Sequence, residues 1–265
     1  MKLLSRLKFE TFIDAGGAEG YQAAMVRDFF GAKVMSVDLS AAACKRAHDI
    51  YGIPAQAVDS RLMPFRDGEF DVVLASETIE HIVDYRAVIA ELLRIARKAV
   101  IITVPREELS QVAESARDYG KHGHIHAFDL ESFDYLISPS LSVMTHGILL
   151  RSKRMNVADL LMETNSELPK DLGKWASTIG WLTRHPNIAK VLFNRFVAGL
   201  FLEEKELRAK RPRAHYEGVV AVLIKDPDVW RSKPSRTVRL SSVMAYSVPY
   251  HYLGHTVNSD HSGLR

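Results

Sequence analysis

Three apolar runs near the start of the chain each end in an acidic residue. Asp14 closes the run at residues 9–14 and precedes a glycine-rich segment, and Asp38 and Asp59 close the next two runs. The carboxyl ends of parallel strands meet at one edge of a sheet, where ligands of α/β proteins bind. Glycines let the backbone turn tightly and approach a ligand, and a helix N-terminus follows them. Asp38 at such an edge can accept hydrogen bonds from both hydroxyls of a ribose, so the pattern indicates a nucleoside-type ligand.

Asp59 is followed by the apolar residues 62–65, and an acid beside an apolar wall suits an adenine ring with its exocyclic amine. A dinucleotide is a competing ligand. Its fingerprint, G-x-G-x-x-G counted from Gly16, would need glycine where the chain has Ala18 and Tyr21. The acid before the glycines would also repel a pyrophosphate but would tolerate a cation. The spacing therefore disfavours a dinucleotide.

Histidines occur in two places where a proton acceptor could act near neutral pH. Glu80 and His81 follow the fourth apolar run, and His122, His124 and His126 alternate within the segment 121–128. Alternating histidines share one face of an extended segment and could bind a metal there. The His-x-His-x-Asp-His pattern of metallohydrolases is not met, so we expect no metal site. A polar loop with only a structural role remains the alternative for both groups.

The elements that would position these residues follow from the alternation of apolar runs with helical periodicity, which predicts βαβ units around a parallel, doubly wound sheet. Ser40 is the expected N-cap of the second helix and Gly31 the expected C-cap of the first. The expected strands are residues 9–14, 33–37, 55–58, 70–75, 99–104, 143–150 and 218–224. The expected helices are residues 21–30, 40–51, 84–96, 106–118 and 130–137.

After residue 150 the strand pattern stops and resumes once. We therefore expect four regions: an α/β core at 1–150, a helical insertion at 151–212, the final strand within 213–226 and a tail at 227–265. Residues 1–150 carry 16 Lys and Arg against 21 Asp and Glu, a net charge of −5, and residues 151–265 carry 19 against 11, a net charge of +8. The second region either faces an anionic partner or presents a solvated basic face.

A long expected helix at 188–210 combines a wide apolar face with a basic end. This pattern is typical of a core helix covering a sheet. It also fits an apolar lid with a basic rim, which would suit an amphiphilic or phosphate-bearing molecule, or peripheral membrane contact through 188–213. No nucleic acid is expected, because the basic residues alternate with acids and lack an aromatic stacking platform.

Composition agrees with a globular protein. Of the 265 residues, 47% are hydrophobic and 25% are charged, and Cys44 is the one cysteine, which excludes disorder and an internal disulfide framework. The N-terminal apolar stretch is too short for a signal peptide. No run approaches the ~18 apolar residues that a membrane span needs. We expect a cytoplasmic protein.

The ordered set of motifs resembles the class I S-adenosylmethionine-dependent methyltransferases, in particular the small-molecule group that includes the ubiquinone-type enzymes. The motifs are the segment FIDAGGAEG at 12–20, the pair Val37-Asp38, Asp59 with LMPF at 62–65, and FDVV at 70–73 leading into SETIEH at 76–81. The resemblance covers about residues 9–150 and 218–224. It implies a seven-stranded Rossmann-like sheet with S-adenosylmethionine as cofactor. It assigns the cofactor to Asp14, Gly16, Gly17, Gly20, Asp38, Leu39, Asp59, Ser60, Arg61 and Ser76.

The resemblance also implies in-line transfer of a methyl group to a small or amphiphilic acceptor, most simply on oxygen. Such transfer needs close positioning and exclusion of water, and a hydroxyl acceptor needs a base. His81 follows the strand nearest the methyl group in the family, and His124 or His126 matches a His-then-Phe segment of the ubiquinone-type enzymes. Ala18 replaces the usual middle glycine. The family's N-terminal cap helices are missing, so the insertion at 151–212 is expected to cover the site. The alternative is an inactive methyltransferase-like binding or assembly module.

Overall fold

The computed structural model describes residues 1, 3–118, 123–148, 216, 218–235 and 246. The chain divides into two compact units, residues 1–147 with 218–265 and residues 148–217. The expected insertion at 151–212, with its helix at 188–210 and the segment 188–213, lies outside the described residues. Within the described part, no helix is long and apolar enough to cross a membrane.

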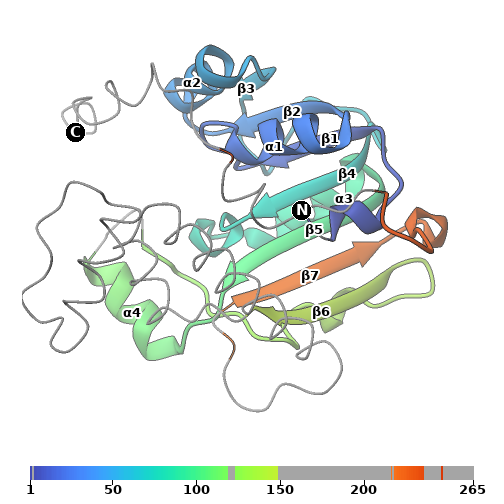
Figure 1. The fold of residues 1–265 in the computed structure, drawn as a ribbon. Coiled ribbons are helices and arrows are strands. Elements are labelled where there is room, and N and C mark those ends of the chain that lie inside the picture. The colour runs from blue at the N-terminus through green and yellow to red at the C-terminus, as the bar shows by residue number, and fades with distance from the viewer. Residues whose placement is uncertain (2, 119–122, 149–215, 217, 236–245, 247–265) are drawn as a thin grey trace, which may run out of the picture. The chain divides into compact units, whose positions relative to one another are not determined.

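A seven-stranded sheet organises the first unit in the order β3-β2-β1-β4-β5-β7-β6, which Figure 1 shows as a continuous succession of strands. Strands β1 to β5 pair in parallel, whereas β7 runs antiparallel to β5. The predicted doubly wound, seven-stranded sheet is confirmed. The sequence pattern did not give the direction of β7, because a buried apolar run looks the same in either direction. The strands are β1 (Thr11–Ala15), β2 (Lys33–Asp38), β3 (Ala55–Ala57), β4 (Phe70–Ser76), β5 (Ala96–Pro105), β6 (Ser142–Ile148) and β7 (Gly218–Ile224).

The order of the strands creates a switch point between β1 and β4. From β1 the chain moves to β2 and β3 on one side, and then returns to β4 and β5 on the other. Asp14 of β1 lies in register with Ser36 of β2 and Leu74 of β4. The loops that leave β1 and β4 therefore open outward on neighbouring strands, and a ligand crevice is expected beyond their carboxyl ends.

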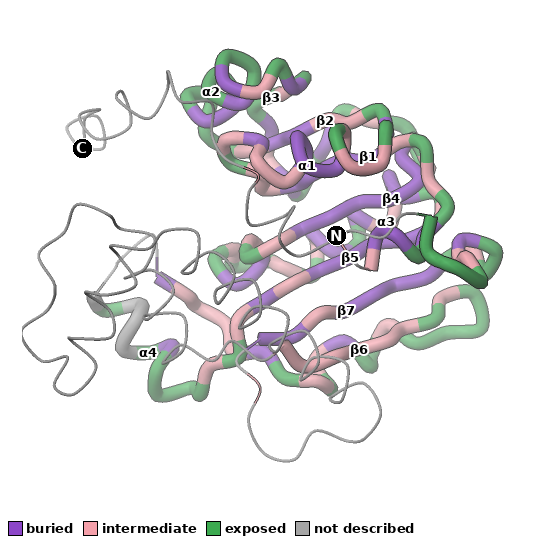
Figure 2. Tube along the Cα trace, in the orientation of Figure 1, coloured by how far each residue is buried: buried purple, intermediate pink, exposed green. Residues whose placement is uncertain are grey.

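The core explains why the central strands read as unbroken apolar runs. Figure 2 shows β4, β5 and β7 buried along most of their length. One cluster joins Phe12, Val72, Ile101 and Val222, which sit on adjacent strands, to Leu7 near the N-terminus. Strands covered on both faces need hydrophobic residues at every position, and this requirement gives the chain its Val- and Ile-rich strands.

Four α-helices connect these strands. The predicted caps are confirmed: Gly31 takes the left-handed conformation (φ 67°) after α1, and the Ser40 hydroxyl accepts a hydrogen bond from the backbone N–H of Ala43 in α2. The Asp84 carboxylate caps α3 in the same way through Ala87 N–H. The α-helices are α1 (Tyr21–Phe30), α2 (Ala41–Tyr51), α3 (Tyr85–Ile95) and α4 (Leu109–Asp118). The 3-10 helices are η1 (Leu4–Arg6), η2 (Ile79–His81), η4 (Asp134–Leu136) and η6 (Pro227–Val229).

The helix predicted at 130–137 is wrong. Only the single 3-10 turn η4 forms there. The Asp129 carboxylate accepts from Glu131 N–H and from the Ser132 hydroxyl, which builds a tight local turn in place of a helical cap. Pro139 then disfavours helical geometry at the residue before it. The buried ring of Phe133 anchors this loop to the core.

Part of the predicted tail packs against the N-terminal segment. Lys8 N–H donates to the Val229 carbonyl, Arg231 N–H to the Arg6 carbonyl and Ser235 N–H to the Ser5 carbonyl. Farther along, the Tyr246 hydroxyl donates to Asp28 on α1. The remaining tail residues, 236–245 and 247–265, lie outside the described part of the chain.

Candidate active site

The glycine loop after β1 is hydrogen-bonded through its backbone and packs too closely against its neighbours to admit larger side chains. Gly16 and Gly17 both donate their N–H to the Val37 carbonyl, at 2.8 and 3.0 Å. Gly16 has φ +80°, and a Cβ there would stand 2.4 Å from the Thr78 side chain. A Cβ on Gly17 would stand 2.4 Å from the Ser36 hydroxyl. The loop therefore lies against both β2 and the loop after β4, and only glycine fits these two positions.

Gly20 and Ala18 complete this turn. Gly20 (φ +76°) is the N-cap of α1, and a Cβ there would press on Ala47 of α2. Ala18 takes a left-handed φ of 43°, which costs a residue with a Cβ roughly 1 kcal/mol or more. Its N–H donates to Asp38 Oδ2 at 2.9 Å. The substitution of the usual glycine is thus accommodated by a hydrogen bond that Ala18 donates to Asp38 at the end of β2.

Asp38 joins two loops. Besides Ala18 N–H on Oδ2, the carboxylate accepts Ser40 N–H on Oδ1 at 2.8 Å. Each carboxylate oxygen offers two lone pairs, so both can still accept a further donor such as a ribose hydroxyl. Leu39 beside it is 78% exposed, which leaves an apolar surface next to the acid. Asp38, the predicted ribose-binding acid, can therefore still accept hydrogen bonds from ribose hydroxyls.

Asp14 is a buried acid with an unsatisfied oxygen. It is 1% exposed, and its Oδ2 has no hydrogen-bond partner among the described residues. Burial, and to a smaller extent the negative charge of Asp38, raise the pKa of Asp14 to about 7. A cationic ligand beside such a group would supply the missing partner. The residues present thus fit a ligand that carries positive charge and a ribose, as S-adenosylmethionine does.

The third acid, Asp59, is exposed and paired within its own loop. The Arg61 guanidinium contacts Asp59 Oδ2 at 2.6 Å, and this hydrogen bond lowers the pKa of the carboxyl. Ser60 between them is 9% exposed, and Leu62 beyond them is 79% exposed. In the described structure, the predicted adenine motif is therefore an ion pair between Asp59 and Arg61 next to the exposed side chain of Leu62.

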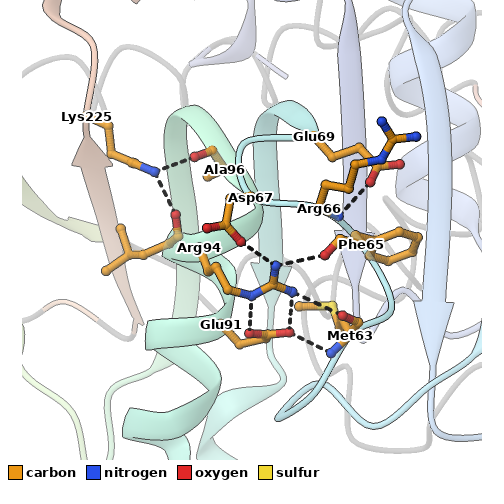
Figure 3. Close-up of polar contacts among 10 residues, drawn as sticks. Met63, Phe65, Arg66, Asp67, Glu69, Glu91, Arg94, Ala96 and Lys225 are labelled. Carbon is orange, nitrogen blue, oxygen red and sulfur yellow. Dashed lines mark hydrogen bonds and ion pairs between the residues drawn. The ribbon is translucent and has the colours of Figure 1, made fainter.

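A clasp from α3 fixes the loop that follows Asp59 (Figure 3). Arg94 donates to the carbonyls of Phe65 and Met63, at 2.8 and 3.0 Å, and to Asp67 at 2.7 Å. Glu91, one turn earlier, accepts both Met63 N–H and Arg94. Sequence reasoning missed this clasp, although the Glu91 and Arg94 pair at i, i+3 on an amphipathic helix was visible. The clasp ties the loop at 59–67, which contains the predicted adenine motif, to α3. We refer to this segment as the adenine-side loop.

A second group of polar residues follows β4. Glu80 in η2 is 0% exposed, and neither of its carboxylate oxygens has a hydrogen-bond partner among the described residues. Burial raises the pKa of Glu80 to about 7. The neighbouring Glu77 has φ 51° and a pKa that burial also raises. Glu77 accepts from the Thr103 hydroxyl, which also contacts the hydroxyl of Ser76.

The structure separates the three predicted histidines. His81 Nδ1 lies 3.3 Å from the Gly123 carbonyl, and His124 Nδ1 lies 2.6 Å from Glu107 Oε2, with the two imidazole rings 4.8 Å apart edge to face. His126 instead donates from Nε2 to the Ile82 carbonyl. His81 and His124 therefore share a site, whereas His126 holds the loop in place. His122 lies outside the described residues.

Two loops carry this second group, and backbone contacts lock them together. Ile125 N–H donates to the Glu80 carbonyl at 2.9 Å, between the His81 and His126 contacts. The ring of His126 also packs edge-on against Tyr85 at the start of α3. Sequence reasoning named His81 and His124 but missed Glu107, because its partner is 17 residues away and the spacing carries no signal.

Comparison with known proteins agrees with the geometry. Residues 13–104 match a family model described as a methyltransferase domain. Tocopherol O-methyltransferase of Arabidopsis thaliana, a chloroplastic protein, is 29% identical over 122 residues, which are 42% of this chain and 35% of that protein. The chain thus spans well under two thirds of that relative, and 41% of a second curated relative.

Solved structures share the fold. A sarcosine dimethylglycine methyltransferase from Galdieria sulphuraria, described as putative, superposes with a TM-score of 0.55 at 14% identity, covering 85% of this chain and 82% of that one. Phosphoethanolamine N-methyltransferase 2 of Haemonchus contortus, solved with S-adenosyl-L-methionine, gives a TM-score of 0.52 at 17% identity, covering 83% and 49%.

Proposed function

The chain belongs to the class I S-adenosylmethionine-dependent methyltransferases, and on that premise we propose that it methylates an oxygen atom of a small or amphiphilic acceptor. The observation that carries the proposal is the pairing of two acidic sites at one switch point. Asp14 and Asp38 lie at the carboxyl ends of β1 and β2, and the cluster of Glu80, His81 and His124 lies beyond β4. The first site suits the cofactor, and the second suits the acceptor.

At the cofactor end, the protein binds S-adenosylmethionine and orients its methyl group. S-adenosylmethionine supplies an electrophilic methyl group on a sulfonium. Asp14 provides a buried negative charge for the positive end of the cofactor, and Asp38 provides acceptors for its ribose hydroxyls. The loop at 59–65, clasped by Arg94, takes the adenine. The methyl group is thereby held in one direction, which is the main contribution such an enzyme makes.

At the acceptor end, the protein handles a proton. A hydroxyl is a poor nucleophile until its proton leaves, and the groups that receive protons near neutral pH are imidazoles and carboxyls with raised pKa values. His81 and His124 lie together here, and burial raises the pKa of Glu80 to about 7. An amine that is already neutral attacks through its lone pair and needs no base, whereas an alkylammonium must first lose a proton. The abundance of proton acceptors therefore favours oxygen over a nitrogen that is neutral at working pH.

The acceptor itself is proposed to be amphiphilic or anionic. The net charge of +8 in residues 151–265 attracts an anionic group, and the apolar pattern at 188–210 suits a hydrocarbon part. Contact with an anionic membrane surface through 188–213 would serve the same acceptor. The relative named tocopherol O-methyltransferase acts, by its name, on an oxygen atom of tocopherol.

The test is transfer of a labelled methyl group from S-adenosylmethionine to matched pairs of acceptors that differ only in hydroxyl against amine. We expect methylation of phenolic or lipid hydroxyls, and a rate that falls about 100-fold or more in His124→Gln. His48→Gln, on the exposed face of α2, is the matched control and should keep the wild-type rate. Preference for the amines would overturn the choice of oxygen. Cofactor binding without transfer to any acceptor would favour a binding module.

A further inference from the structure

Glu80, His81 and His124 form a compact group of potential metal ligands. One ligand atom from each lies within 4.8 Å of the other two. Two ligands of a single ion, each about 2.1 Å from it, stand roughly 3 to 4 Å apart. Small side-chain rotations would therefore bring all three onto one ion. The alternating pattern of His122, His124 and His126 does not produce this group, because His81 and Glu80 come from a different loop.

The surroundings of the Glu80 carboxylate indicate that this group of three residues needs a positive charge. The other buried glutamate of the described chain, Glu91, is bonded by Arg94 and Met63 N–H, and the buried Asp71 is bonded by Arg97 and backbone N–H groups. Glu80 is 0% exposed and neither of its carboxylate oxygens has a hydrogen-bond partner among the described residues, with only His81 Nε2 at 3.8 Å from Oε1. A buried carboxylate without donors is costly, and a bound cation removes that cost.

Both histidines have one ring nitrogen on a supporting group, as metal-ligating histidines do. A ligating imidazole usually gives its other nitrogen to a backbone carbonyl or a carboxylate, which fixes the ring. His81 has Nδ1 against the Gly123 carbonyl, and its Nε2 faces Glu80. His124 has Nδ1 against the Glu107 carboxylate. Both supporting contacts come from groups outside the trio, so they would persist when an ion binds.

We propose that Glu80, His81 and His124 bind one divalent transition-metal ion, with Glu107 as a positioning residue for His124. Two imidazoles and one carboxylate suit Mn²⁺, Co²⁺ or Zn²⁺, whereas Mg²⁺ and Ca²⁺ prefer oxygen ligands throughout. The inference deepens the proposed function and rests on it only for the role of the ion. With the ion bound, these three side chains would act through it and not as bases themselves: the ion would bind the acceptor hydroxyl and lower its pKa, so that the proton leaves to solvent.

The experiment is a titration of Co²⁺ into the full chain after dialysis against a chelator, followed by calorimetry and by the visible absorption of the ion. The wild type is expected to bind one equivalent with a coordinated spectrum. Glu80→Gln keeps the shape of the side chain but removes its charge, and should weaken binding at least tenfold. Glu107→Gln should weaken it about tenfold through His124. His48→Gln should bind as the wild type does.

The half-exposed His81 provides a second variant that does not disturb the core. If Glu80→Gln fails to fold, His81→Gln must lose the same binding. Wild type that binds no more Co²⁺ than the double variant Glu80→Gln, His81→Gln overturns the proposal. Methyl transfer that persists in chelator-treated protein also overturns the role of the ion, while leaving the proposed function standing. Tight Co²⁺ binding without methyl transfer would support the site and count against the function.

Discussion

The two ends of the switch point differ in how their acids are satisfied. After β2, Asp38 is held by two backbone N–H groups, and after β3, Asp59 is held by Arg61. After β4, Glu80 is buried, and its carboxylate oxygens have no hydrogen-bond partner among the described residues. The proposed cofactor end thus has most of its acids bonded within the protein, whereas the proposed acceptor end holds a buried carboxylate without a hydrogen-bond partner among the described residues.

Asp14 lies between these two cases and shows what the difference means. It belongs to the cofactor end, yet its Oδ2 is unsatisfied within the described chain. Unsatisfied acids at a rigid edge mark the points where a cationic ligand is needed. Removing the charge of Asp14 or Glu80 should therefore raise the free energy of unfolding of the unliganded protein, whereas disrupting hydrogen-bonded groups should lower it.

The largest expected effect is the pH dependence that Asp14 causes. Burial raises its pKa from 3.8 to about 7, so between these values the folded protein holds a proton that the unfolded chain has lost. Stability then falls as pH rises between these two values, and each pKa unit corresponds to about 1.4 kcal/mol, or about 4 kcal/mol in total, of which about 2.7 kcal/mol is lost between pH 5 and pH 8. Asp14→Asn should remove this decline. Urea unfolding at pH 5 and pH 8 measures it.

A matched control separates this effect from a general change in charge. Asp49→Asn removes an exposed carboxylate from α2, whose ion pair with Lys45 lies at the surface. That variant should keep the wild-type dependence of stability on pH. If Asp14→Asn were less stable than wild type at pH 8, the carboxylate would be satisfied in the folded protein, and the contrast between the two ends would fail.

The clasp of Arg94 should produce a smaller effect, of about 2 kcal/mol. Arg94→Met leaves the buried Glu91 without its guanidinium and frees the carbonyls of Met63 and Phe65. Both stability and affinity for S-adenosylhomocysteine should fall, because the adenine-side loop loses its anchor. Thermal unfolding and calorimetry give the two values. Arg86→Met, on the same helix but packed over Tyr135, should change neither by a comparable amount.

The smallest expected effect distinguishes the histidines. His126 bonds the Ile82 carbonyl and packs on Tyr85, so His126→Gln, which can still donate that bond, should retain methyl transfer within about threefold. His124→Gln should lose far more, since His124 belongs to the acceptor cluster. Equal losses in the two variants would show that the structure assigns their roles wrongly.

The fold was largely predictable because its signals are local. Seven strands and the first three helices follow from apolar runs, Ser40 and Gly31, and each agrees with the structure to within a few residues. The turn at 130–137 was not predictable in this way, since the Asp129 side chain competes with the helix for backbone donors. The direction of β7 depends on its pairing with β5, which no local pattern contains.

The site was predictable only where residues follow strand ends. Asp14, Asp38 and Asp59 occupy such positions, and topology brings the first two together. The contact of His81 with His124 and the support of His124 by Glu107 join segments from two loops, as does the clasp of Arg94 on Phe65. Such long-range contacts arise from packing, so spacing along the chain does not reveal them.

Calorimetric titration of S-adenosylhomocysteine into wild type, Asp38→Ala and Glu80→Gln tests the division between the two ends most directly. Asp38→Ala removes the acceptor for Ala18 and Ser40 N–H and should weaken binding about 100-fold. Glu80→Gln lies at the other end and should bind as the wild type does. Unchanged affinity in Asp38→Ala, or an equal loss in Glu80→Gln, would contradict the account.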